Sequence, residues 1–258
     1  MARGITPCVT FYISALGPNS APAGLGSDPL SRRLPKRQVE VYAYEVFIQK
    51  FLKGICGLRN EEAEAMASEQ GIQCNWWRNV HMIRPDEIQA KLTDRNLGWH
   101  LNHYDAIDPA TAEEFYKNTP FISTTAGTVE RQAFLWRNEV RSAFVTALEF
   151  ATKNFTADGH VFYGYLFTLG KTAVPLQAFA EEVRELNVYT MFLPFQPEGE
   201  IAAKIHIPAV NIEKVELYNG PAAHRDLAQG HMPGYSQAFA NPHYEQPEKF
   251  SNVREVIL

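Results

Sequence analysis

The chain has 258 residues, of which 45% are hydrophobic and 21% are charged, and this composition excludes a chain that is disordered throughout. Its 24 lysines and arginines are outnumbered by 29 aspartates and glutamates, and the formal net charge of −5 argues against a protein that grips nucleic acid through phosphates. No run in the sequence approaches the roughly 18 apolar residues that a membrane-spanning helix needs.

The N-terminal segment, residues 1–38, is rich in Gly, Pro and Ser without a sustained hydrophobic period, which predicts a flexible leader. A short basic start, the apolar stretch Ile5–Leu16 and then Ala21-Pro22-Ala23 follow the order of a secretory signal, although Pro7 interrupts the apolar run. A signal or pro-segment and a plain solvated linker therefore both stay open.

Residues 39–72 predict a small helical lobe. Apolar residues recur at helical spacing over Val41–Ile55, and Gly57 is a typical helix stop. A second helix is predicted over Glu61–Glu69, because acidic residues crowd its first turn and Asn60 suits the cap position. This lobe carries no obvious chemistry.

Shorter elements follow. The bulky segment Cys74–Ile83 predicts a buried strand, and Pro85-Asp86-Glu87 predicts the start of a helix. Residues 93–120 are polar, with one predicted helical turn at Thr111–Tyr116. A strand end is predicted at Phe121–Thr125.

The second half of the chain is richer in strands. A long amphipathic helix is predicted over Val129–Ala151, and the alternating bulky residues of Val161–Leu169 predict the clearest strand. The later predicted elements are a short helix at Ala178–Glu185 and strands at Val188–Leu193, Glu200–Ile207 and Val215–Tyr218. Helices before Gly159 and strands after it predict the α+β class, and residues 221–258 are predicted as an extended tail.

Two candidate clusters are set aside. His100 and His103 lie near Asp105, but no HExxH motif accompanies them and the segment reads as a loop, so the sequence favours surface histidines over a metal site. The cysteines are odd in number and form no CxxC, which favours neither a disulfide framework nor zinc. They are Cys8, Cys56 and Cys74, the last predicted as a core residue.

Three short motifs follow one another along the chain. The first is Trp77-Arg78 on a predicted strand, with Arg84 opening an Arg-Pro-Asp-Glu-Ile run soon after. The second is Phe-Ile-Ser-Thr-Thr at 121–125, and the third is a Glu-x-Glu at the start of a predicted strand. Taken singly each arises by chance, and a pair of acids is more often a solvated strand end.

In combination the motifs resemble the mono-ADP-ribosyltransferases of the cholera-toxin type. That family has an aromatic-Arg pair on its first strand, an aromatic-hydrophobic-Ser-Thr-Ser motif and a Glu-x-Glu before a later strand. The chain departs from the pattern at Thr125, where serine is usual, and at Val80, where an acid is usual; Arg84 also competes with Arg78. The resemblance spans about Asn75–Tyr218.

The resemblance implies an ADP-ribosyltransferase-like fold, with a split mixed β-sheet core, flanking helices and the small N-terminal helical lobe. Together with the composition and hydrophobic pattern of the rest of the sequence, it divides the chain into four parts. These are a leader at 1–38, a helical lobe at 39–72, the catalytic domain at 73–220 and an extended tail at 221–258.

The resemblance also implies the chemistry of the two acids. Such enzymes break the bond between nicotinamide and ribose in NAD, through a transition state with oxocarbenium character. Glu200 would stabilise that charge and hold the ribose 2′-hydroxyl, and Glu198 would align or deprotonate an attacking arginine. Phe195 would contact the acceptor protein, with a loop residue that covers the core as the alternative.

The remaining motif residues are implied to bind NAD. Arg78, or Arg84 in its place, would meet the phosphates with its planar fork of donors. Ser123 would fix the loop that bears the acids and bond to Glu200, while Thr124 and Thr125 support the wall beside nicotinamide.

The function implied is a toxin or effector that transfers ADP-ribose from NAD to a protein arginine and needs no metal. A secreted or injected protein is favoured over a resident cytoplasmic enzyme, with a delivery subunit as an open partner. Two alternatives remain: an NAD glycohydrolase on the same fold, with water as the acceptor, and a binding module without catalysis.

Overall fold

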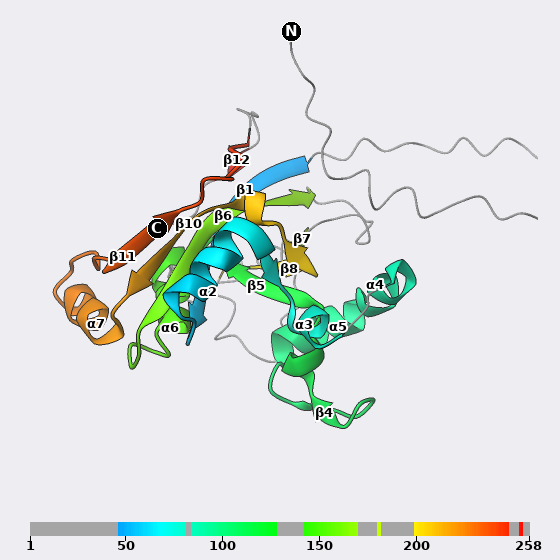
Figure 1. Ribbon diagram of the computed structural model, residues 1–258. Coiled ribbons are helices and arrows are strands. Elements are labelled where there is room, and N and C mark those ends of the chain that lie inside the picture. Colours follow the sequence, from blue (N-terminus) through cyan, green and yellow to red (C-terminus); the bar gives the residue numbers. More distant parts are fainter. Residues whose placement is uncertain are drawn as a thin grey trace, which may run out of the picture. The chain divides into compact units, whose positions relative to one another are not determined.

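The computed structural model describes residues 46–80, 84–127, 142–169, 180–181, 199–247 and 253–254. Within this part of the chain a mixed sheet is flanked by helices (Figure 1). The strands of the main sheet are β1 (Val46–Cys56), β5 (Phe121–Thr125), β6 (Gly159–Leu169), β7 (Ala180–Glu181), β8 (Glu200–Lys204), β10 (Ile212–Tyr218), β11 (Gln237–Ala240) and β12 (Val253–Arg254). Their order is β11-β10-β6-β7-β8-β5-β1-β12. The α+β class predicted from the sequence is confirmed.

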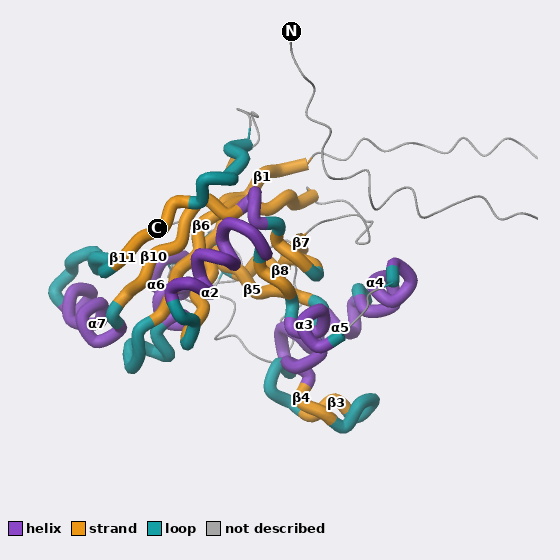
Figure 2. The backbone as a smooth tube through the Cα atoms, in the orientation of Figure 1, coloured by secondary structure: helices purple, strands orange, loops and turns teal. Residues whose placement is uncertain are grey.

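Helices and two small sheets complete the described structure (Figure 2). The helices are α2 (Asn60–Ala65), α3 (Asn75–Asn79), α4 (Pro85–Lys91), α5 (Asp94–Asn102), α6 (Ala143–Ala151) and α7 (Gly220–Ala228). Shorter turns are a π-helix at Met66–Gln70 and 3₁₀ turns at Phe115–Asn118 and Ala209–Asn211. The small sheets pair β2 (Ile72–Gln73) with β9 (His206–Ile207), and β3 (Ile107–Asp108) with β4 (Glu113–Glu114). No described helix has the length and apolar character needed to cross a membrane.

The strands β1 and β6 form the longest pairing of the sheet, antiparallel from Val46 opposite Leu169 to Cys56 opposite Gly159. On its other edge β6 pairs with β10 and, near its end, with β7. The pairings continue from β7 to β8, from β8 to β5 and from β5 back to β1. The strands β5 and β8, which carry two of the three motifs, are therefore direct neighbours.

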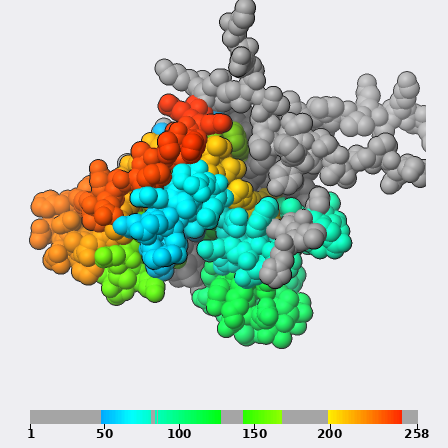
Figure 3. All heavy atoms as spheres, in the orientation of Figure 1, coloured from blue at the N-terminus to red at the C-terminus, as the bar shows by residue number. Residues whose placement is uncertain are grey.

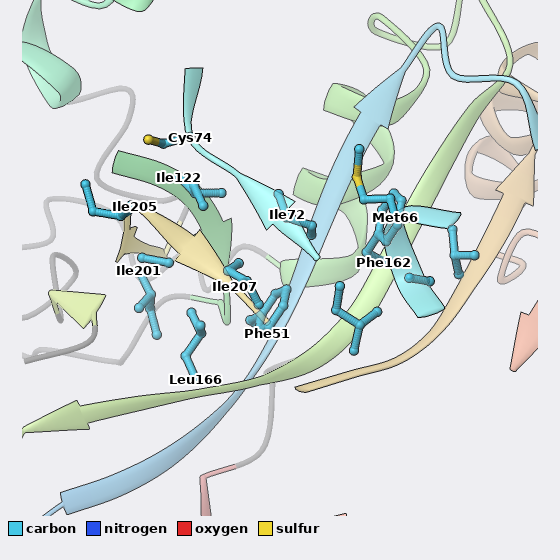
Figure 4. Close-up of a cluster of buried hydrophobic side chains, with 14 of the residues drawn as sticks. Phe51, Met66, Ile72, Cys74, Ile122, Phe162, Leu166, Ile201, Ile205 and Ile207 are labelled. Atoms are coloured by element: carbon cyan, nitrogen blue, oxygen red, sulfur yellow. The ribbon is translucent and has the colours of Figure 1, made fainter. Parts of the chain in front are cut away.

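Two apolar clusters lie on opposite faces of this sheet. Successive side chains of a strand alternate between faces. Phe51 and Phe162 accordingly join a cluster with Met66 beside α2, part of which is drawn in Figure 4. Leu52 joins the cluster that α6 covers on the other face. A Cβ atom on Gly54 would lie 1.9 Å from the carbonyl oxygen of Ala147, so the absence of a side chain lets α6 lie directly on β1.

The end of the described chain also belongs to the sheet. Asn219 caps α7 by accepting the N–H of Ala222, and β11 then pairs along β10. In the space-filling view α2 (cyan) lies beside β11 (orange-red) (Figure 3). Asn60 of α2 donates a hydrogen bond to Gln237 of β11. The prediction of an extended segment after residue 220 is wrong for these two elements.

Several predicted elements have a different structure. The helix predicted over Val41–Ile55 is wrong for Val46–Cys56, which forms β1 because apolar residues on both faces hide the alternation of a strand. The strand predicted over Cys74–Ile83 is wrong for Asn75–Asn79: the Cys74 thiol accepts the N–H of Trp77 and caps α3. The described part of Ala178–Glu185 is the strand β7 rather than a helix.

Other predictions are confirmed where the structure describes them. The helix at Glu61–Glu69, the helix start at Pro85 and the strand at Phe121–Thr125 are present, as are the later strands of the sheet. The helical turn predicted at Thr111–Tyr116 is instead the β3–β4 hairpin followed by a 3₁₀ turn. The predicted leader, residues 129–141 of the predicted long helix and the predicted strand at Val188–Leu193 lie outside the described residues. The helix α6 confirms only the end of that predicted helix, and the domain boundaries stay predictions.

Candidate active site

The pairing of β5 with β8 brings the second and third motifs together. In the antiparallel register Ser123 lies opposite Ala202, and Thr125 lies opposite Glu200. The Glu200 side chain is buried, although it begins its strand. A carboxylate in this position is partly withdrawn from water and lies directly opposite the last residue of the Ser-Thr-Thr segment. The predicted alternative of a solvated strand end does not describe it.

A glycine controls how the chain enters β8. Gly199 has φ of 61°, in the left-handed region, and its carbonyl accepts the N–H of Ala126 at 3.1 Å. A Cβ atom at this position would lie 2.2 Å from the carbonyl carbon of Gly127. Only glycine fits here without displacement, so the end of β5 and the start of β8 are held backbone to backbone.

His100 is the residue that the sequence interpretation missed. It is buried, not a surface residue, and its Nε2 atom lies 2.9 Å from Ser123 Oγ and 3.3 Å from Glu200 Oε1. It shares the buried face of α5 with Leu97 and Leu101, at helical spacing. That spacing is the signal that would have placed His100 toward the core.

The other ring nitrogen of His100 has its own partner. Nδ1 lies 2.8 Å from the hydroxyl of Thr119, which also accepts the N–H of Phe121. In a serine hydrolase the serine and the acid lie at opposite ring nitrogens of the histidine. Here Ser123 and Glu200 share Nε2, so the three residues do not form such a triad.

Lys53 adds a cation from β1. Its Nζ atom donates a hydrogen bond to the carbonyl oxygen of Ser123 at 2.8 Å. Burial lowers the pKa of this amine to about 8; the charge of Glu200 opposes the shift and the charge of Arg78 adds to it. The sequence did not indicate Lys53, because its strand was predicted to be a helix.

The two candidate arginines differ in their surroundings. Arg78 lies exposed on α3 rather than on a strand, and its charge acts on Lys53. Arg84 is the N-cap residue of α4, where its guanidinium pairs with Glu87 at 2.6 Å. Glu87 in turn accepts the backbone N–H of Arg84, closing a local cap. Arg84 is thus engaged by its own helix, and Arg78 is the arginine next to the site.

The threonines of the second motif are internal. The Thr124 hydroxyl donates to the carbonyl oxygen of Ile201 at 2.7 Å and ties β5 to β8. Thr125 is buried opposite Glu200.

Tyr104 is an aromatic side chain of the site that is nearer to solvent. Its ring stands edge-on to His100, with 5.6 Å between the ring centroids, and the residue is 40% exposed. Burial raises the pKa of the Tyr104 phenol, and the charge of Glu200 adds to the increase.

Two predicted site residues, Glu198 and Phe195, lie outside the described residues. Among those that are described, no group of three or more histidine, cysteine or acidic side chains could hold a metal ion. The described site therefore consists of a buried carboxylate, an imidazole, a hydroxyl and two nearby cations. Such a set can stabilise a positive charge, hold sugar hydroxyls and bind an anion.

The chain matches no protein-family model and no curated protein. Among solved structures it is similar to one described as EcPltA, with a TM-score of 0.40 and 13% sequence identity. The alignment covers 81% of this chain and 93% of that one.

Proposed function

We propose that this protein is an NAD-dependent mono-ADP-ribosyltransferase, which cleaves NAD and transfers ADP-ribose to an arginine of another protein. The observation that carries the proposal is the carboxylate of Glu200. It is buried beside the Ser-Thr-Thr strand, and among the described residues its Oε1 atom has no aligned hydrogen bond. A buried carboxylate is costly unless its charge is matched, and the cationic centre of a reacting ribose would match it.

The first step is cleavage of NAD. The bond between the nicotinamide nitrogen and ribose C1′ breaks, its electron pair leaves with neutral nicotinamide, and positive charge develops on the ribose. Glu200 stabilises that charge and accepts a hydrogen bond from the ribose 2′-hydroxyl. His100 lies against this carboxylate at 3.3 Å, and Ser123 holds the same ring nitrogen of His100 at 2.9 Å.

The second step is transfer. A guanidinium nitrogen of the acceptor forms a bond to C1′ and loses a proton, which Glu198 accepts. An arginine side chain stays protonated in water, so a carboxylate is needed to hold and activate it. Phe195 contacts the acceptor protein. The family resemblance extends this proposal to a toxin or effector.

The phosphates of NAD require positive charge near the site. Arg78 supplies it as a planar fork of donors on the exposed face of α3. Arg84 is the weaker candidate, because Glu87 already engages its guanidinium.

The test incubates the full chain with labelled NAD and agmatine, a small guanidine acceptor, and follows nicotinamide release and labelled product. Glu200→Gln is expected to lower the rate by at least about a hundredfold, since it removes the charge aimed at the transition state. Glu213→Gln on β10, an exposed acid of the same sheet, is the matched control and should keep the wild-type rate.

The outcomes separate the alternatives. Labelled agmatine supports the transferase, whereas free ADP-ribose as the sole product would assign the site to an NAD glycohydrolase. If folded protein releases no nicotinamide and NAD does not raise its melting temperature, the site is not an NAD site and the proposal is wrong.

A further inference from the structure

The amine of Lys53 joins two strands at the candidate active site. The strands β1 and β5 share one backbone pair among the described residues, Leu52 opposite Thr125. One residue beyond Leu52, the Lys53 side chain reaches the carbonyl oxygen of Ser123 at 2.8 Å. The ammonium group therefore adds a side-chain hydrogen bond between β1 and β5, next to their single described backbone pair. A charged donor makes a shorter and stronger hydrogen bond than a neutral one.

Ser123 is consequently held at both ends. Its carbonyl is bound to Lys53, and its hydroxyl lies 2.9 Å from Nε2 of His100. His100 lies in turn 3.3 Å from Glu200. Any displacement of the Ser123 backbone toward or away from β1 moves the hydroxyl relative to both of these groups.

We propose that Lys53 is a positioning residue of this site, whose ammonium group fixes the Ser123 carbonyl and so sets where the Ser123 hydroxyl meets His100, the residue that lies against Glu200. Its effect on catalysis rests on the proposed function; the hydrogen bond and its dependence on charge do not. The chemistry requires the protonated amine, because a neutral amine is a weaker donor.

The charge on Lys53 is sensitive to pH in an accessible range. Burial lowers the pKa of the amine to about 8, with Glu200 opposing the shift and Arg78 adding to it. Among the described residues, the other titratable groups that face this cluster are His100 and the phenol of Tyr104. The positioning bond is thus at full strength well below pH about 8 and weakens as the pH rises through that value.

With rising pH, the contribution of Lys53 to stability should change in the opposite direction from the strength of its hydrogen bond to Ser123. A lysine whose pKa is lower in the folded than in the unfolded state binds fewer protons when folded, between pH about 8 and about 10.4. The Lys53 contribution to stability therefore increases with pH through this window. A loss of activity above pH about 8 would then not reflect unfolding.

The experiment measures kcat and KM for nicotinamide release between pH 6 and 10, in the wild type, Lys53→Arg, Lys53→Met and Lys50→Met. In the wild type, kcat should fall as the pH rises above about 8. The arginine variant keeps its charge throughout this range and should not show this fall in kcat. The methionine variant should lower kcat by about ten- to hundredfold and leave KM within about twofold, as expected for a displaced reacting group. Lys50→Met lies on the opposite face of β1 and should match the wild type.

A second measurement needs no NAD. NMR titration of ¹³C-labelled lysine side chains should give Lys53 a pKa well below that of the exposed lysines, and Lys53→Met should shift the Ser123 amide resonance. An ordinary pKa, an unmoved Ser123 resonance, or an arginine variant with the wild-type alkaline decline would each overturn the proposal. If the protein releases no nicotinamide, the NMR result alone decides the role of Lys53. If Lys53→Met does not fold, Lys53→Arg and the wild-type titration decide it.

Discussion

The hydroxyl of Thr119 lies 2.8 Å from Nδ1 of His100, on the side of the ring opposite Glu200. Both residues are buried. Ser123 and Glu200 both lie at Nε2, so Thr119 is the hydrogen-bond partner of the other ring nitrogen. Thr119 thus completes the hydrogen bonding of the imidazole and keeps Nε2 toward Ser123 and Glu200.

Replacing Thr119 by valine keeps the shape of the side chain and removes that partner. The buried Nδ1 atom then has no hydrogen bond from residue 119, which is expected to cost about 1–3 kcal/mol of unfolding free energy. Urea denaturation measures the loss. Thr119→Ser keeps the hydroxyl and should recover most of it.

The matched control is Thr146→Val on α6. Thr146 is equally buried, but its hydroxyl has no hydrogen-bond partner among the described residues. Its removal should leave stability unchanged or slightly higher. Equal losses at positions 119 and 146 would show that a buried threonine matters here only for packing, against the role assigned to Thr119.

Gly199 is expected to tolerate no side chain. A Cβ atom would lie 2.2 Å from the carbonyl carbon of Gly127, and φ of 61° adds backbone strain. Gly199→Ala should therefore displace the start of β8 and with it Glu200, lowering the melting temperature and abolishing turnover. Gly230→Ala separates the two causes, because Gly230 also has positive φ, 75°, but open space around it. It should cost only about 1 kcal/mol; a similar loss at both positions would contradict the crowding argument.

The strands that bear the second and third motifs could be predicted because their local residue patterns are typical of strands. In the Phe-Ile-Ser-Thr-Thr segment, bulky residues precede β-branched ones, which suits a strand, and Glu200 opens a run of small and apolar residues that also suits one. The family resemblance then implied that they meet. Their register, Thr125 opposite Glu200, depends on distant pairings that no local pattern contains.

The cation and the imidazole of the site escaped prediction for physical reasons. Lys53 lies on a strand whose neighbours Phe51 and Leu52 enter cores on opposite faces, so apolar residues stand side by side and their spacing imitated a helix. His100 lies in a polar stretch whose short helix begins at the capping residue Thr93. Its partners Ser123 and Glu200 are brought to it only by the tertiary fold.

The two candidate arginines should separate in binding experiments. Arg78→Ala is expected to raise KM for NAD several-fold with a smaller effect on kcat, since it removes the proposed contact to phosphates, which would persist through the reaction. Arg84→Ala should leave KM unchanged and only loosen the start of α4, where Glu87 caps the helix. Steady-state kinetics of nicotinamide release measures both. The reverse result would make Arg84 the phosphate ligand.

A buried polar cluster on β10 predicts how acid destabilises the protein. Glu216 is buried and accepts hydrogen bonds from Lys214 at 2.7 Å and from Tyr218 at 2.6 Å. Burial alone would raise the pKa of the Glu216 carboxyl, but the hydrogen bonds from Lys214, Tyr218 and Tyr163 outweigh it and hold the pKa below its usual range.

The lowered pKa of Glu216 determines how its contribution to stability changes with pH. A carboxyl whose pKa is lower when folded stabilises the protein above its unfolded pKa of about 4.3, and the stabilisation disappears as pH falls through the folded value. Glu216→Gln should therefore cost about 1–3 kcal/mol at pH 7 and progressively less below pH about 4. Urea denaturation at several pH values tests this, with the exposed Glu213→Gln as the control that should show no such change. A loss that is independent of pH would mean that Glu216 stabilises the sheet through packing rather than through its charge.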